Sequence, residues 1–308
     1  MSKQYFNNHD WGVEMSRMED LGLDVRTFSN GKLGFIAGLV DALGIPKLFN
    51  DTYEEHKEAG CHVKIPLGSV AKLFLINICD NHHPLYRMQE YFEDKDLPQL
   101  AGTEVQLEDL TDDRFASLLD HLFHWGPRSI FSTIATQAFF QYGLSIRTLN
   151  YDTTSKVMWG EYQDEGGKVG AISITVGHSK DKRPDKNQLK VGLGTADGVI
   201  CDAKVLSGNE DDKTYNNVTI DDVATLLEQH KVDRSGFYYV ADAAFFTEEN
   251  LRKAQSYGMH FITRAPETLQ VTNELLQTAW EQTDAFRRTA FTNAQQTETP
   301  YYVLFMAN

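Results

Sequence analysis

The sequence has few cysteines, no long hydrophobic run and no apolar segment at its start. The three cysteines, Cys61, Cys79 and Cys201, are widely separated, which argues against a disulfide framework and fits a reducing compartment. The longest apolar stretch, around 70–78, is interrupted by Lys72 and Asn77 and is shorter than the roughly 20 residues that span a bilayer. The first thirty residues are rich in charge and lack the apolar core of a signal peptide. We therefore expect a cytoplasmic protein with no membrane partner.

Positive charge is also scarce. The chain has 29 Lys and Arg against 44 Asp and Glu, a net charge of −15. An acidic protein is repelled by a phosphate backbone, so any contact with nucleic acid has to come from a local basic surface. The shortage is marked in residues 1–145, where 12 basic and 21 acidic side chains give a net charge of −9.

What the sequence does contain is material for two globular domains. Its 308 residues are 41% hydrophobic and include 18 Phe and 13 Tyr, enough for buried cores. Residues 1–145 have apolar positions at helical spacing, in 33–43, 67–78, 86–92, 115–123 and 130–142. Thr111, followed by two aspartates, is typical of a helix start. We predict an all-helical N-terminal domain over 1–145.

From residue 146 the pattern changes to strands. We predict strands at 146–151, 171–176, 189–194 and 199–206, with a turn at 196–198, then a helix at 221–229, a strand at 237–241, a helix capped by Thr247 at 247–257 and a strand at 259–263. An antiparallel set joined to parallel strands by crossover helices is the RNase H topology. We expect an α/β fold with an RNase H-like mixed sheet, incomplete in this chain, over 146–308. An inserted segment would start at about 267.

Two aspartates follow strands of this predicted sheet. Asp152 ends the first strand and Asp242 ends the strand at 237–241, where α/β sheets place ligand groups. Phosphodiester chemistry by two metal ions needs hard oxygen ligands converging on Mg²⁺ or Mn²⁺. Asp152 and Asp242 are therefore our candidate catalytic residues and metal ligands, for two ions. The alternative is that both are turn residues at strand ends.

Four short segments, in order, resemble insertion-sequence transposases of the DDE type, especially the IS-four-like branch with a helical N-terminal domain. They are Tyr-Asp-Thr-Thr-Ser at 151–155, the basic loop at 177–185 with Gln188, Leu-Ser-Gly-Asn at 206–209 with Asp211 and Asp212, and Val-Ala-Asp-Ala-Ala at 240–244. The resemblance implies metal-dependent hydrolysis at the ends of a mobile element, followed by strand transfer to target DNA. It also implies double-stranded DNA as partner, through terminal inverted repeats and target, and a homodimer.

The third acid of that family, a glutamate on a late helix, has no counterpart that we identify. Glu267, Glu274 and Glu281 follow the last core strand too closely and lack the tyrosine, arginine and lysine of its setting. We expect a C-terminally truncated transposase. Two alternatives stay open: a non-catalytic remnant that binds DNA or a partner, and an RNase H-like nuclease unrelated to transposition. The helical domain would bind the inverted repeats or mediate dimerisation.

The loop 178–190 is the local basic surface that the overall charge requires. Five basic and two acidic side chains give it a net charge of +3. Because it lies beside the predicted Asp152 strand, this loop is our candidate for binding DNA phosphates. The alternative, which the sequence favours equally, is that it is the solvated face of a hairpin. The candidate DNA-binding residues are His178, Lys180, Lys182, Arg183, Lys186 and Lys190. The glycines at 192 and 194 are interpreted as a hairpin turn, because no helix follows them as in a nucleotide-binding loop.

Overall fold

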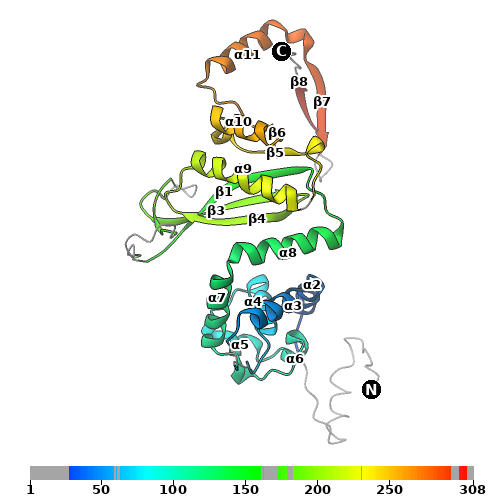
Figure 1. Cartoon of the computed structure of the whole chain (residues 1–308), viewed down its shortest axis with the longest axis vertical. Coiled ribbons are helices and arrows are strands. Elements are labelled where there is room, and N and C mark those ends of the chain that lie inside the picture. The colour runs from blue at the N-terminus through cyan, green and yellow to red at the C-terminus, as the bar shows by residue number, and fades with distance from the viewer. Residues whose placement is uncertain are drawn as a thin grey trace, which may run out of the picture. The chain divides into compact units, whose positions relative to one another are not determined.

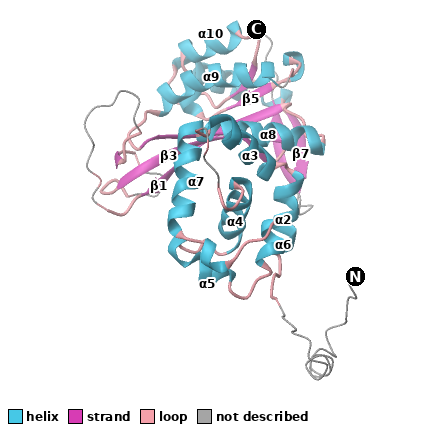
Figure 2. Ribbon diagram, turned by 60° about the horizontal axis from the view of Figure 1, so that its bottom comes forward, coloured by secondary structure: helices cyan, strands magenta, loops and turns pink. Residues whose placement is uncertain are grey.

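The computed structural model divides the chain into two compact units, residues 1–143 and 144–308 (Figure 1). The structure describes residues 28–58, 60, 63–160, 162, 172–178, 183–229, 231–292 and 298–303. The first unit is helical and the second combines a mixed sheet with helices (Figure 2). The fold is therefore α/β with a helical N-terminal region.

The first unit is built around helix α4, most of whose residues are buried. Leu73 and Ile76 are fully buried, and α4 contacts α2, α3, α6 and α7. The unit consists of α2 (Leu33–Ala42), α3 (Ile45–His56), α4 (Leu67–Asp80), η1 (Leu85–Arg87), α5 (Met88–Phe92), α6 (Leu97–Ala101), η2 (Leu107–Asp109), α7 (Asp112–Trp125) and α8 (Pro127–Tyr142). Helix α7 begins as predicted after Thr111, although its hydroxyl makes no capping hydrogen bond.

No single described helix is long and apolar enough to cross a membrane. The helices α2 and α3, which are bent by 54° relative to each other, are long and apolar enough only when they are taken together. Leu33, Ala37, Ile45 and Phe49 of this pair lie in the core of the first unit.

The second unit contains a sheet in which β4, β3, β1, β5 and β6 are successive neighbours. Strands β1 (Thr148–Val157), β3 (Asn187–Ala196) and β4 (Val199–Ser207) pair antiparallel, and β5 (Tyr238–Val240) and β6 (His260–Ile262) continue the sheet in parallel. A short strand, β2 (Thr175–Val176), also pairs with β3. This order and these directions are the RNase H-like arrangement that the sequence predicted.

Crossover helices connect the parallel strands. Helix α9 (Asp212–Gln229) precedes β5, and α10 (Glu248–Ser256) lies between β5 and β6, with short turns η3 (Arg234–Gly236) and η4 (Ala243–Phe245). Thr247 caps α10 as predicted, because its hydroxyl accepts a hydrogen bond from Asn250 N at 3.2 Å. Helix α11 (Gln270–Glu281), η5 (Thr283–Ala285) and the hairpin of β7 (Arg287–Thr292) and β8 (Glu298–Val303) follow.

Four sequence predictions need correction. Of the strand predicted at 171–176, only Thr175–Val176 forms β2, and the described residues 172–174 are not in a strand. Strand β1 does not end at Asp152 but continues to Val157, because the ten-residue β3 still pairs with it there. Helix α9 begins nine residues earlier than predicted. Gly192 and Gly194 lie inside β3 and not in the hairpin turn. The turn predicted at 196–198 is confirmed, because the φ values of 52° at Asp197 and 78° at Gly198 suit a type I′ turn.

Candidate metal centre and basic hairpin

Asp152 lies on the open face of β1. Side chains along β1 alternate between exposed and buried, so Leu149 and Tyr151 face the interior while Asn150 and Asp152 face outward. The Asp152 Oδ1 accepts a hydrogen bond from the Thr153 backbone N–H at 2.8 Å. The alternation that gives β1 its buried face therefore presents the carboxylate on the other one.

Asp242 follows β5 and begins the turn η4. Its Oδ1 accepts a hydrogen bond from the backbone N–H of Ala244 at 3.0 Å, and its backbone carbonyl accepts one from the Thr263 hydroxyl at 2.7 Å. The side chain is exposed. These two bonds fix the carboxylate at the end of the strand.

The register of the two strands places the two aspartates at equivalent positions along neighbouring stretches of backbone. Strands β1 and β5 pair in parallel through Asn150 and Val240, and two further residues along each strand lead to Asp152 and Asp242. Adjacent strands lie about 4.8 Å apart, so the two carboxylates start from neighbouring backbone positions. Carboxylates are the hard oxygen ligands that Mg²⁺ and Mn²⁺ prefer, so two of them at equivalent positions make a candidate metal centre.

No third metal ligand joins them within the described part of the chain, which contains no group of three or more His, Cys, Asp or Glu side chains suited to a metal. Glu274 and Glu281 lie exposed on α11, where each accepts a hydrogen bond from a glutamine of its own helix.

The aspartates rest on an aromatic cluster on the opposite face of the sheet. Tyr239 is fully buried between Tyr151, at 6.0 Å between ring centroids, and Phe245 of η4, at 5.2 Å. Tyr215 of α9 packs on Tyr151, and the Tyr151 hydroxyl bonds Asp202 of β4. These residues hold β1, β5 and η4 in register. Of these residues, only Tyr151 belongs to one of the four motif segments.

The basic hairpin is only partly as predicted. His178 is exposed, Arg183 and Lys186 are partly exposed, and Lys180 and Lys182 lie outside the described residues. Lys190 needs correction as a phosphate contact, because it is only 5% exposed and its ammonium donates to the Glu210 backbone carbonyl at 2.6 Å. Even-numbered residues of β3 face the interior, which places this cation inside the unit.

Gln188 connects two of the motif segments. It is fully buried, and its Nε2 donates to the carbonyl of His178 at 3.0 Å and to that of Gly208 at 2.7 Å. The backbones meet so closely that a Cβ at Gly177 would lie 2.1 Å from the Gly208 carbonyl oxygen. Gln188 therefore ties the start of the basic loop to the turn after β4, a structural role that its sequence context alone did not reveal.

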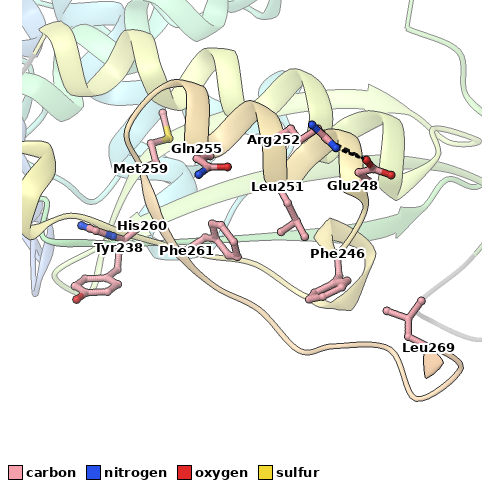
Figure 3. A pocket seen from close by; sticks show the side chains of 10 residues that line it. All are labelled: Tyr238, Phe246, Glu248, Leu251, Arg252, Gln255, Met259, His260, Phe261 and Leu269. Carbon is pink, nitrogen blue, oxygen red and sulfur yellow. Dashed lines mark hydrogen bonds and ion pairs between the residues drawn. The ribbon is translucent and has the colours of Figure 1, made fainter. Parts of the chain in front are cut away.

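A groove of about 830 Å³ lies between α10 and the edge of the sheet at β6. Leu251, Phe246 and Phe261 supply apolar walls, and the ion pair between Glu248 and Arg252, at 2.7 Å, stands at one end (Figure 3). Neither aspartate lines this groove. This groove is therefore separate from the candidate metal centre.

A family model matches part of the first unit, whereas similar solved structures match most of the chain. Residues 25–136 match a family model described as a domain of unknown function, DUF4277. A search of curated proteins finds no significant relative. Similar solved structures include a piggyBac transposase synaptic complex with hairpin DNA, at 12% identity and a TM-score of 0.40, covering 87% of this chain and 59% of that chain.

Further similar structures are Mos1 transposases. The Mos1 mariner paired-end complex with Mn has 7% identity and a TM-score of 0.27, over 87% of this chain and 84% of that one. The Mos1 catalytic domain with Raltegravir and Mn has 7% identity and a TM-score of 0.26, over 50% and 71%. All three are transposases. Their low TM-scores transfer no residue or geometry to this chain.

Proposed function

We propose that this chain is a DNA transposase of the DDE type, related to the IS-four-like insertion sequences, in which Asp152 and Asp242 hold the catalytic metal ions. The observation that carries the proposal is their register: Asp152 on β1 and Asp242 just after the adjacent strand β5 are both exposed, and each lies two residues beyond the last β1–β5 pair, Asn150 and Val240. The order of the four motif segments supports DNA as the substrate.

The residues present fit a divalent metal. Hydrogen bonding of the Asp242 Oδ1 to Ala244 N orients that carboxylate and leaves its second oxygen as a ligand. A bound pair of Mg²⁺ or Mn²⁺ ions supplies activation of the nucleophile and stabilisation of the leaving oxygen. The reaction we propose is hydrolysis at the element ends, followed by attack of the freed 3′-hydroxyl on target DNA.

Basic side chains on the same part of the unit would bind the DNA backbone. Lys156 is exposed on the face of β1 that carries Asp152. Arg183 and Lys186 lie on the hairpin that leads into β3, the neighbour of β1. In a chain with a net charge of −15, these local cations are where phosphate contact is expected. Lys156 is an addition to the residues that the sequence singled out.

Metal binding tests the centre directly. We expect Mn²⁺ titration, followed by the electron paramagnetic resonance signal of the free ion, to show binding by the unaltered chain. Asp152→Asn and Asp242→Asn each remove a charged oxygen ligand and should weaken binding at least about tenfold. Asp197→Asn is the matched control, because it removes an exposed carboxylate from the β3–β4 turn and Asn tolerates its positive φ. Equal Mn²⁺ affinity in all four proteins would refute the centre.

Catalysis is tested by nicking of a supercoiled plasmid that carries the element ends, with Mg²⁺ or Mn²⁺. The proposal expects metal-dependent nicking that both Asp→Asn variants abolish. A second candidate, a non-catalytic DNA-binding remnant, is favoured by one observation: within the described residues the two aspartates have no third ligand. DNA binding without metal-dependent nicking would select that candidate.

For the helical unit, the proposal is a role in binding the inverted repeats or in dimerisation. The net charge of −9 over residues 1–145 favours dimerisation, because no excess of cations is present to neutralise phosphate. Analytical ultracentrifugation of the whole chain, with and without DNA, separates the two. A dimer in the absence of DNA supports dimerisation, and a monomer that dimerises only on DNA supports end binding.

A further inference from the structure

Trp159 is a large exposed aromatic residue immediately after β1. Its side chain is 70% exposed. Pairing between β1 and β3 continues up to its neighbour, because Met158 N donates to the Asn187 carbonyl at 2.8 Å. Counting onward in register from Val157 and Gln188 places Trp159 opposite Lys186. The indole therefore stands at the end of a rigid two-stranded ribbon.

Two cations lie against this ring. The Lys186 Nζ is 5.0 Å and the Arg183 Cζ is 5.6 Å from the ring centroid. Both belong to one turn, closed by the hydrogen bond from Lys186 N to the Arg183 carbonyl at 3.2 Å. Cation–π attraction at these distances orients the ring relative to the turn. Arg183 is paired with Asp185 at 2.9 Å, and the charge of Lys186 also acts on that carboxylate and helps to lower its pKa.

This combination suits a nucleobase with its phosphate. An exposed indole offers an apolar face on which any base can stack, and an adjacent ammonium can bind the phosphate beside that base. Bases inside a duplex are already stacked on their neighbours, so the ring can accept only an unpaired base. A ring that served merely to pack the hairpin would be covered, and this one is not.

We propose that Trp159 and Lys186, with Arg183, form a stacking site for an unpaired nucleobase of the DNA substrate. The inference rests on the proposed action on DNA and adds a positioning residue to it. Seven residues of extended strand, roughly 23 Å, separate Trp159 from Asp152 along β1. The site would therefore bind the DNA at a distance from the reacting phosphate, where the substrate is frayed or single-stranded.

The test compares two probes that differ only in unpaired bases. One is a 20-base-pair blunt duplex, and the other is the same duplex with a single-stranded 3′ extension of four nucleotides containing 2-aminopurine. We expect the whole chain to bind the extended duplex more tightly, with quenching of the 2-aminopurine fluorescence on stacking. Trp159→Ala should lose about 5- to 100-fold in affinity for the extended duplex only, together with the quenching. Trp159→Phe should retain most of both.

The control is Trp280→Ala, which removes an equally exposed tryptophan, at 77%, from helix α11. It should bind both probes like the unaltered chain, and a loss as large as that of Trp159→Ala would overturn the inference. Lys186→Met should weaken binding to both probes and lower the salt dependence by about 0.9 in log–log slope.

The remaining outcomes separate the inference from the proposed function. If the unaltered chain binds neither probe, both the stacking site and the proposed action on DNA are refuted. If it binds both probes equally and Trp159→Ala changes nothing, the stacking site is refuted while action on DNA stands. Trp159→Phe is the control for misfolding, because it keeps an aromatic ring at this position. If Trp159→Ala also lost binding to the blunt duplex, a role confined to unpaired bases would be contradicted.

Discussion

Replacing Gly192 with alanine should destabilise the second unit, because the helix-facing side of β3 has no room for a methyl group. A Cβ at this position would lie 1.8 Å from the Tyr215 Oη and 2.3 Å from its Cζ. Tyr215 is 3% exposed and cannot swing into solvent. The strand cannot retreat either, since Gly192 is paired with Thr153 on one side and Lys204 on the other.

The expected cost is at the upper end of the overpacking range, about 3 kcal/mol. For a unit of this size that corresponds to a fall of roughly 6 to 12 °C in the melting temperature. Calorimetry of the whole chain measures the shift, and hydrogen exchange followed by mass spectrometry assigns it to β3 and α9. Peptides of the helical unit should exchange as before, because the clash lies wholly within the second unit.

Gly34→Ala is the matched control. Gly34 is an exposed helical residue of α2 whose added Cβ would meet nothing within 4 Å, so alanine should stabilise that helix by about 0.5 to 1 kcal/mol. The pair Gly192→Ala and Tyr215→Ala should cost less together than the sum of the single changes, because the second removes the ring that the first meets. A Gly192→Ala variant that melts within about 1 °C of the unaltered chain, with unchanged exchange in α9, would refute this packing.

Three further outcomes are expected. The Arg183 hydrogen bond lowers the pKa of Asp185 to about 2, so this carboxylate is charged and neutralises Arg183 at every pH above about 4. Asp185→Asn should therefore raise the affinity for duplex DNA at pH 7 and steepen its salt dependence. A fall in affinity would contradict this. Burial, with the nearby Asp202, raises the pKa of the Cys201 thiol to about 11, so iodoacetamide at pH 8 should label exposed Cys79 and spare Cys201 until the chain unfolds, as mass spectrometry would show. Asn77→Ala should cost about 1 to 3 kcal/mol in calorimetry, since the fully buried amide makes two hydrogen bonds of 2.8 Å to backbone groups after α4; a loss below about 0.5 kcal/mol would show those groups to be otherwise satisfied.

Local sequence signals determined most of the elements and their order. Apolar spacing predicted the helices of the first unit, and alternating residues with turn signals predicted the strands of the second. The RNase H-like order of strands followed from these elements, because short crossover connections leave few ways to arrange them. The prediction that Asp242 follows a strand is confirmed, because Asp242 comes two residues after the end of β5.

Properties that depend on partner strands could not be read from the sequence. Asp152 was expected at a strand end, but β1 continues because β3 supplies hydrogen bonds as far as Val157. Lys190 was expected to reach phosphate, but the register of β3 turns it inward, where its charge is satisfied by the Glu210 carbonyl. A one-residue difference in strand register exchanges the buried and exposed faces, and composition carries no information about that choice.

The sequence by itself determined which residue types are available: two aspartates in the right order, a cationic loop and an acidic remainder. Only the tertiary structure decided which of them meet. Parallel pairing of β1 and β5 puts Asp152 and Asp242, about 90 residues apart in the chain, each two residues beyond the same paired position, and antiparallel pairing of β1 with β3 brings Lys186 to Trp159. Both arrangements arise from backbone hydrogen bonding between strands distant in sequence, which local patterns do not encode.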